Sequence, residues 1–254
     1  MKLASFDIFD TTLLRSCGKP EAVFHVLAER LFPNDKDLRE AFVVWRKSTK
    51  GNTLTDVYDK IDSAFLTFAK KNKEEIMKAE EETEEDVLIA NPSVCKLIDQ
   101  RRIEGYNIAF ISDMYLNSQF LRKVLQRNGC CRQEDAIYVS CEHNARKDTG
   151  LLYKVVRNEL HPTEWIHYGD NIRSDIKMAK SKGIRAIHIN TWHNNAERAC
   201  SQVSTSMAEL AKQYRLRHKD NEFAAFAADF VVSAYLPYVI HVLREARGMG
   251  IRKL

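Results

Sequence analysis

The chain has 254 residues, of which 44% are hydrophobic and 29% are charged, enough for one or two globular domains with a sizeable core. Its formal net charge of +4 is small and spread along the sequence, which argues against a nucleic-acid partner. Six cysteines without a CxxC pair predict reduced thiols in a cytoplasmic protein and argue against a zinc site. Met1 and Lys2 lead directly into an apolar run, so no signal peptide is expected.

The first predicted element is a strand over residues 3–9, because this run is apolar throughout, as in a parallel strand covered on both faces. Its end carries the sequence Asp7-Ile8-Phe9-Asp10-Thr11-Thr12. A carboxylate at the end of such a strand is usually a turn former or a helix cap. In this sequence Asp7 is also a candidate functional residue, because polar residues follow later strands in the same way.

Residues 15–92 have helical periodicity throughout and are predicted to form a helical insertion, a cap domain beside the edge of the sheet. Thr53 and Asp56 have the spacing of a capping box, which predicts one helix with Val57, Ile61, Phe65 and Phe68 on a single face. The acidic run 80–86 is interpreted as a solvated helix face. The basic residues Arg46, Lys47 and Lys50 also lie in the cap, where they could meet the distal charge of a substrate, but a position on the solvated cap surface is favoured for them.

The rest of the core alternates between strands and helices. Helices are predicted over 117–129, 151–156 and 176–183, each placed between two apolar runs. This alternation predicts an α/β fold with a Rossmann-like doubly wound parallel sheet, whose core domain comprises residues 1–14 and 93–200. The later strands are expected at 107–112, 136–140, 165–169 and 185–189.

Residues 201–254 lie outside this core and are predicted to be helical. The stretch 223–243 is apolar and aromatic, but Asp229, Pro237 and His241 interrupt it, so we expect a buried helix or a domain contact and no membrane span. The last residues repeat the helix-glycine-strand pattern of 103–108. The hypothesis is that this segment begins a second, fused module of a longer protein.

Four groups of polar residues follow strands or open helices, in the order Asp7, Ser112, Lys147 and the run Gly169-Asp170-Asn171-Ile172-Arg173-Ser174-Asp175. In a parallel sheet, chemistry is concentrated beyond the carboxyl ends of the strands. Each group alone is common, but the four together in this order and placement resemble the motifs of the haloacid dehalogenase (HAD) superfamily of hydrolases. The resemblance covers residues 1 to about 200. It is closest to members with an FDxFDT opening and a helical cap between the first two motifs.

Physical chemistry assigns roles that fit this resemblance. Asp7 is expected to attack phosphorus and form an aspartyl-phosphate, and an anion approaching an anion requires a divalent cation between them. Mg²⁺ takes one or two carboxylates, here Asp7 and Asp170, and the resemblance adds the carbonyl of Phe9. Asp175 and Asn171 are expected to support this site or to supply a direct ligand. Ser112 and Lys147 are expected to hold the phosphoryl oxygens.

Residues beside these motifs have weaker assignments. Thr11 is expected to orient the loop after the nucleophile, and Arg15 follows it where a substrate anion could reach. Asp10 is interpreted as structural.

Phe9 departs from the pattern, because phosphatases of this superfamily usually have an acid/base aspartate two residues after the nucleophile. Three explanations are open. Another group takes the role, with Asp113 as the nearest candidate by sequence, although a turn-forming role is favoured for it. Alternatively, the reaction is a phosphonate cleavage or dehalogenation, or the domain binds phosphate or a partner without catalysis.

The sequence therefore predicts a Mg²⁺-dependent, HAD-like phosphohydrolase that acts on a small phosphorylated metabolite. The acidic fourth motif favours a metal, and hence phosphate or phosphonate over a haloacid. The substrate and the oligomeric state cannot be read from one sequence.

Overall fold

The computed structural model describes residues 1–191, 193–203, 205–218 and 221–251. Its centre is a five-stranded parallel sheet with the order β5-β4-β1-β6-β7, as the alternation of strands and helices predicts. All five predicted strands are present, and β1 ends three residues earlier than expected, at Phe6. The strands are β1 (Lys2–Phe6), β4 (Asn107–Ser112), β5 (Ala136–Val139), β6 (Glu164–Gly169) and β7 (Arg185–His188).

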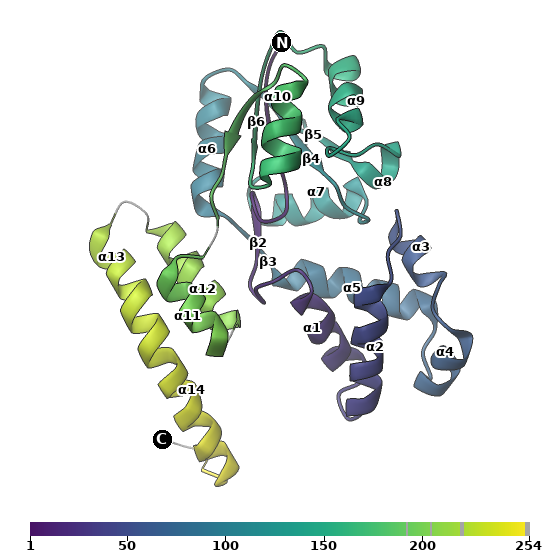
Figure 1. Ribbon diagram of the computed structural model, residues 1–254, viewed down its shortest axis with the longest axis vertical. Coiled ribbons are helices and arrows are strands. Elements are labelled where there is room, and N and C mark those ends of the chain that lie inside the picture. Colours follow the sequence, from purple (N-terminus) through teal and green to yellow (C-terminus); the bar gives the residue numbers. More distant parts are fainter. Residues whose placement is uncertain (192, 204, 219–220, 252–254) are drawn as a thin grey trace.

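Helices cover both faces of this sheet, which explains why its strands are apolar on both sides. On one face, Phe6 and Phe110 pack with α6 (Pro92–Ile103) and α7 (Ser118–Arg127). On the other face, Leu3 and Ile111 pack with α9 (Leu151–Leu160) and α10 (Ala179–Ser181). The sheet is thus doubly wound and three-layered (Figure 1). A short helix, α8 (Ser140–His143), follows β5.

The chain leaves the sheet after β1 through a two-stranded antiparallel stem of β2 (Leu13–Arg15) and β3 (Leu88–Ala90). Between these two strands lie five helices, beyond the edge of the sheet where β1 ends (Figure 1). We call this group the cap. Its helices are α1 (Ala22–Leu31), α2 (Lys36–Ser48), α3 (Leu54–Tyr58), α4 (Ser63–Ala69) and α5 (Lys73–Val87).

The prediction of a single helix after Thr53 is wrong. The capping box of Thr53 and Asp56 does open α3, but this helix ends at Tyr58, and α4 begins only at Ser63. The carboxylate of Asp62 accepts a hydrogen bond from the Ala64 backbone N–H at 2.8 Å and starts the new helix. An Asp cap offers the backbone an alternative to continuing the helix, and hydrophobic periodicity does not reveal it.

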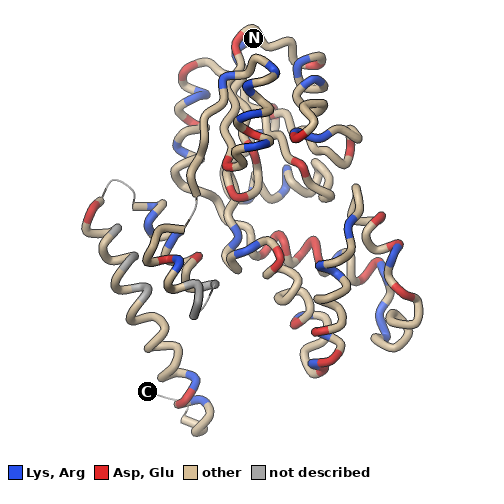
Figure 2. Tube along the Cα trace, in the orientation of Figure 1, with Lys and Arg blue, Asp and Glu red and all other residues tan. Residues whose placement is uncertain are grey.

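The prediction that residues 80–86 form a solvated helix face is also wrong in part. Figure 2 marks acidic residues along α5, yet Glu80 and Glu84 are only 0% and 2% exposed. Glu80 accepts two hydrogen bonds from Arg46, at 2.8 and 2.6 Å, and one each from Tyr58 and Tyr115. Arg46, expected on the surface, is therefore buried as well. A glutamate on a helix is usually exposed to solvent. Glu80 can be buried here because hydrogen-bond donors on α2, α3 and the core converge on its carboxylate.

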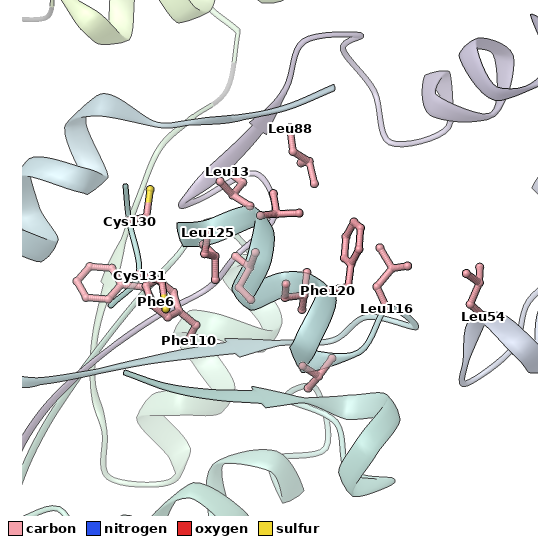
Figure 3. Close-up of a cluster of buried hydrophobic side chains, with 14 of the residues drawn as sticks. Phe6, Leu13, Leu54, Leu88, Phe110, Leu116, Phe120, Leu125, Cys130 and Cys131 are labelled. Atoms are coloured by element: carbon pink, nitrogen blue, oxygen red, sulfur yellow. The ribbon is translucent and has the colours of Figure 1, made fainter. Parts of the chain in front are cut away.

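One hydrophobic cluster extends from the sheet through the stem into the cap. Figure 3 shows Phe6 and Phe110 of the sheet, Leu13 and Leu88 of the stem, and Leu54 at the start of α3. Phe120 and Leu125 of α7 belong to the same cluster. Continuous burial of this kind ties the cap to the core by the hydrophobic effect.

After β7 the chain forms a group of helices whose long last member extends away from the sheet (Figure 1). Its members are α11 (Asn195–Val203), α12 (Thr205–Arg217), α13 (Glu222–Ala227), the π-helix η2 (Ala228–Val232) and α14 (Ser233–Gly248). The group is attached at α6, where the Ser93 hydroxyl donates to the Leu216 carbonyl at 3.0 Å. In the described part of the chain, no helix combines the length and apolarity that a membrane crossing requires.

The burial expected for the apolar stretch 223–243 is found in part. Ala228 is buried, and Leu236 and Ile240 pack against α11 and α12. The large side chains of Phe223, Phe226, Tyr235 and Tyr238 are all more than half exposed. Residues 252–254, where a new strand was expected, lie outside the described residues.

Candidate active site

The topology of the sheet explains how distant parts of the sequence meet. β1 lies between β4 and β6, and this is where the direction of winding reverses. Ligands of open α/β sheets bind at such a switch point, beyond the carboxyl ends of the strands. Asp7 follows β1, Ser112 ends β4 and Asp170 follows β6, so all three reach the same edge of the sheet. Together with Lys147 and Asp175 they line a cavity of about 400 Å³.

Asp7 is held firmly in a buried turn. Its backbone N–H donates to the Tyr168 carbonyl at 2.8 Å, and its carbonyl accepts from the Thr12 hydroxyl at 2.6 Å. Its side chain is 6% exposed and faces Lys147, whose Nζ lies 2.5 Å from Oδ1. The Thr11 hydroxyl lies 3.4 Å from Asp7 Oδ2 and 3.2 Å from Asp170 Oδ1, so it links the first and fourth motifs.

Lys147 is shared between two carboxylates. Its Nζ also lies 2.7 Å from Asp175 Oδ1. Burial disfavours the charged form of Lys147, but the neighbouring Asp7 and Asp175 raise its pKa well above the usual value. Burial alone would raise the pKa of Asp175, yet Lys147 and His167 hold it far below its usual range. Lys147 and Asp175 are therefore a charged pair.

Three carboxylates face this one ammonium group. Oxygens of Asp7, Asp170 and Asp175 all lie within 4.8 Å of one another. Burial and the charges of Asp175 and Asp170 raise the pKa of Asp7 despite its contact with Lys147. Burial and the charges of Asp10 and Asp175 likewise raise the pKa of Asp170. An excess of negative charge on oxygen ligands is what a hard divalent cation would neutralise, so the donor set fits Mg²⁺.

The two candidate supporting residues of the fourth motif differ in what their side chains contact. Asp175 Oδ2 accepts from the Asn171 backbone N–H at 3.0 Å, so Asp175 is bound on both oxygens. Asn171 caps the following π-helix η1 (Ile172–Met178), because its side chain accepts from the N–H groups of Arg173 and Ser174. Asp7 Oδ2 and Asp170 Oδ1, which share only the Thr11 hydroxyl at 3.4 and 3.2 Å, are therefore the more available oxygens for a cation.

A buried chain of polar side chains behind Asp175 was not recognised in the sequence. The Trp165 indole donates to Ser5 Oγ at 2.8 Å, and Ser5 Oγ lies 2.8 Å from His167 Nδ1. Because the ionised Asp175 carboxylate can only accept, the neutral ring carries its proton on Nε2, 3.4 Å from Asp175 Oδ1, and the bare Nδ1 then accepts from the Ser5 hydroxyl. Burial lowers the pKa of His167, consistent with this neutral ring. A serine, a tryptophan and a histidine inside strands give no local signal of such a chain.

Gly169 is required at the end of β6 because Asp175 lies directly against it. A Cβ atom at this position would lie 2.5 Å from both Cβ and Cγ of Asp175. We expect Gly169→Ala to displace the Asp175 carboxylate from Lys147 and to cost about 1–3 kcal/mol of unfolding free energy through overpacking. Urea unfolding measures this cost. Gly248→Ala, where a Cβ would meet nothing within 4 Å, is the control, and an equal effect of both substitutions would contradict the prediction.

The other predicted residues also line the cavity, but their side chains have other partners. Asp113, the candidate acid/base group, accepts from the Lys147 backbone N–H at 2.8 Å through Oδ1, which is a loop-forming contact. Arg15 is 4% exposed and lies near two carboxylates, Asp10 at 3.7 Å and Glu84 at 3.4 Å. Its guanidinium stacks over the Phe9 ring at 4.5 Å. The positive charge of Arg15 is thus already balanced by Asp10 and Glu84 without a substrate anion.

Asp10 adopts a left-handed backbone with φ 56°, which few residues other than glycine favour. Its carbonyl accepts from the Thr191 hydroxyl at 2.6 Å, which anchors the turn to the segment after β7. The prediction of a structural role for Asp10 agrees with this geometry.

No protein-family model matches the chain, and no curated protein matches its sequence. Solved structures do match its fold. A Thermotoga maritima protein assigned as a β-phosphoglucomutase is 14% identical, with a TM-score of 0.54 over 83% of this chain and 97% of that one. L-2-haloacid dehalogenase from Xanthobacter autotrophicus is 12% identical, with a TM-score of 0.53 over 83% of this chain and 87% of that one.

A third structure is a variant of a HAD family enzyme from Bacteroides thetaiotaomicron in complex with magnesium and inorganic phosphate. It is 14% identical, with a TM-score of 0.51 over 75% of this chain and 94% of that one. Phosphate-binding and dehalogenase structures are therefore similar to this chain to a comparable degree. The likeness concerns architecture, and on that basis the chain has the fold of the HAD superfamily.

Proposed function

We propose that this protein is a Mg²⁺-dependent phosphohydrolase of the cytoplasm that cleaves a small phosphorylated metabolite through an aspartyl-phosphate at Asp7. The observation that carries the proposal is the group of three carboxylates within 4.8 Å of one another, with Lys147 in contact with two of them. A phosphoryl group needs both a nucleophile and several positive charges around it. A dehalogenase requires no such excess of carboxylates.

Each residue then has one task. Asp7 attacks phosphorus, and its buried turn holds the carboxylate at the edge of the sheet. Lys147 stabilises charge on the phosphoryl oxygens, while Asp175 and the His167 chain fix the direction of its ammonium group. Ser112, which is 2% exposed and ends β4, is positioned to donate a hydrogen bond to a phosphoryl oxygen. Mg²⁺ held by Asp7, Asp170 and the Phe9 carbonyl would neutralise the charge between nucleophile and phosphate.

The phenylalanine at position 9 also restricts the leaving groups that we expect the substrates to have. Its side chain cannot protonate a leaving group, and the Asp113 carboxylate accepts a backbone hydrogen bond. Substrates whose leaving groups depart without protonation, such as aryl phosphates and acyl phosphates, are therefore expected to react faster than alkyl phosphates.

A substrate panel tests this function. We expect hydrolysis of p-nitrophenyl phosphate and acetyl phosphate with Mg²⁺ and loss of activity with EDTA, measured as phosphate release. 2-Chloropropionate is the matched test of a dehalogenase, with chloride release as the readout. Chloride release without Mg²⁺, in the absence of phosphatase activity, would replace the proposal by a haloacid hydrolase. No turnover of any substrate, with phosphate and Mg²⁺ still binding, would favour a non-catalytic phosphate-binding module.

A further inference from the structure

A second cavity, of about 770 Å³, lies within the cap and opens toward the core. Its lining comes from Phe24 of α1, from α2 and α3 with the loops that follow them, and from the core residues Tyr115 and Arg146. Arg146 also lines the active-site cavity and a smaller cavity of about 240 Å³ between the two. Since Lys147 follows Arg146 directly, a molecule with its phosphoryl group at Asp7 could extend past Arg146 into the cap.

The lining of the cap cavity is basic. Lys47 lies in the last turn of α2, Lys50 lies in the next loop and Lys60 follows α3, and all three are exposed on the cavity side of the cap. The Lys60 ammonium donates to the Lys50 carbonyl at 2.5 Å, and the Lys47 ammonium lies 2.9 Å from His25 Nε2. None of the ion pairs in the described part of the chain includes these three lysines.

The negative groups around the cavity are already engaged. Asp59 lies 2.6 Å from Lys73, and Asp56 accepts from the Thr53 backbone N–H within the capping box. Arg46, also in the lining, is bound by Glu80 and stacks over the Phe24 ring. The three lysines therefore have no ion-pair partner among these carboxylates, and the lining keeps an excess of positive charge. Such a concave group of like charges raises the local concentration of ions of the opposite sign.

The remaining wall can accommodate a carbon skeleton. Phe24, Val57 and Tyr115 contribute apolar surface, and Asn52 offers a polar amide. A site with apolar walls and a few charged groups at one end is typical of small-molecule binding sites, and the cavity volume is in their usual range. The sequence offers Lys47 and Lys50 for such a role but favours a solvated surface for them, because basic residues on a helical cap normally face solvent.

We propose that the substrate is a phosphomonoester whose organic part carries a second anionic group, a phosphate or a carboxylate, which binds among Lys47, Lys50 and Lys60. This inference rests on the proposed function for the position of the first phosphate. A substrate with an uncharged distal end would leave the three ammonium groups unpaired. A second anion would pair with them and place the carbon skeleton along the wall to which Phe24, Val57 and Tyr115 contribute.

Matched ligand pairs test the proposal. Fructose 1,6-bisphosphate is compared with fructose 6-phosphate, and 3-phosphoglycerate with glycerol 3-phosphate, by calorimetry on the native protein with Mg²⁺ at low ionic strength. We expect the doubly anionic member of at least one pair to bind about tenfold tighter or more. The pair that shows this difference identifies the second anionic group as a phosphate or as a carboxylate. Equal affinities within both pairs would overturn the proposal.

The triple substitution Lys47→Met, Lys50→Met and Lys60→Met should remove this preference. It should leave kcat/KM for p-nitrophenyl phosphate within about twofold, since that small substrate does not reach the cap lysines. The matched control is Lys36→Met, Lys70→Met and Lys78→Met, which changes the net charge of the cap equally without touching the cavity. Equal losses in both triple variants would show a general charge effect and contradict the site. Failure of p-nitrophenyl phosphate hydrolysis would refute only the reaction, because the binding comparison does not need turnover.

Discussion

Replacement of Asp7 by asparagine should lower kcat/KM for p-nitrophenyl phosphate by at least about 10³-fold, the scale expected when a nucleophile is removed. The amide keeps the size of the carboxylate and can still accept from Lys147, but it cannot attack phosphorus. Phosphate release under saturating Mg²⁺ measures the loss. Turnover close to that of the native chain would remove Asp7 from the mechanism.

The same substitution should increase stability in Mg²⁺-free buffer. An acid whose pKa is raised on folding binds its proton more tightly in the folded state, so its ionisation at neutral pH lowers the free energy of unfolding. The substituted amide does not ionise, and the gain should vanish below pH 3.8, the usual Asp value, where Asp7 of the native chain is protonated in both states. Thermal unfolding across this pH range measures the effect.

In the presence of Mg²⁺, the native chain should instead be more stable than Asp7→Asn. A cation that binds only the folded protein stabilises it by mass action, and the native chain keeps one more carboxylate for that binding than Asp7→Asn. The control is Asp99→Asn, an exposed position on α6, which should alter neither activity nor the Mg²⁺ effect. A native chain that Mg²⁺ fails to stabilise would contradict the assigned metal site.

Glu80→Gln should lower the free energy of unfolding by about 3–5 kcal/mol, as expected when a buried ion pair loses one partner. Glu80 is fully buried, and its two oxygens accept four hydrogen bonds from Arg46, Tyr58 and Tyr115. Glutamine offers one acceptor oxygen, so its amide nitrogen would face donors while Arg46 remained buried and charged. Urea unfolding measures the loss.

Glu82→Gln is the matched control, because Glu82 lies on the same helix with its side chain 60% exposed. Its effect should stay within about 0.5 kcal/mol, the usual range for surface positions. Adding Arg46→Met to Glu80→Gln should recover part of the loss, since the uncompensated charge is then removed. Additive losses in the double variant would show that the two residues do not act as a pair.

Much of the core could be predicted because its signals are local. A strand covered on both faces must be apolar along its length, so β1, β4, β5, β6 and β7 are visible as apolar runs. The helix at 118–127 is equally clear, since Asn117 caps it and its buried residues recur at the helical spacing. Asp7, Ser112 and Asp170 could be grouped because a parallel sheet brings the ends of its strands to one edge.

The cap was predicted less well for a physical reason. Periodicity measures which residues are apolar, and it carries no information about a carboxylate whose donors come from other helices. Glu80 and Glu84 looked solvated for that reason, and the Asp62 cap that divides one expected helix into two was hidden by continuing periodicity.

By itself, the sequence determined the layered α/β sheet, the position of the helical insertion and the identity of the groups at the sheet edge, because burial and strand order depend on local patterns. Only the tertiary structure decided the distances that give those groups their chemistry. Contacts such as Lys147 with Asp7 and Asp175, or His167 with Ser5, join residues far apart in the chain. The three lysines of the cap cavity also depend on the tertiary structure, because only folding brings them to the lining of one cavity.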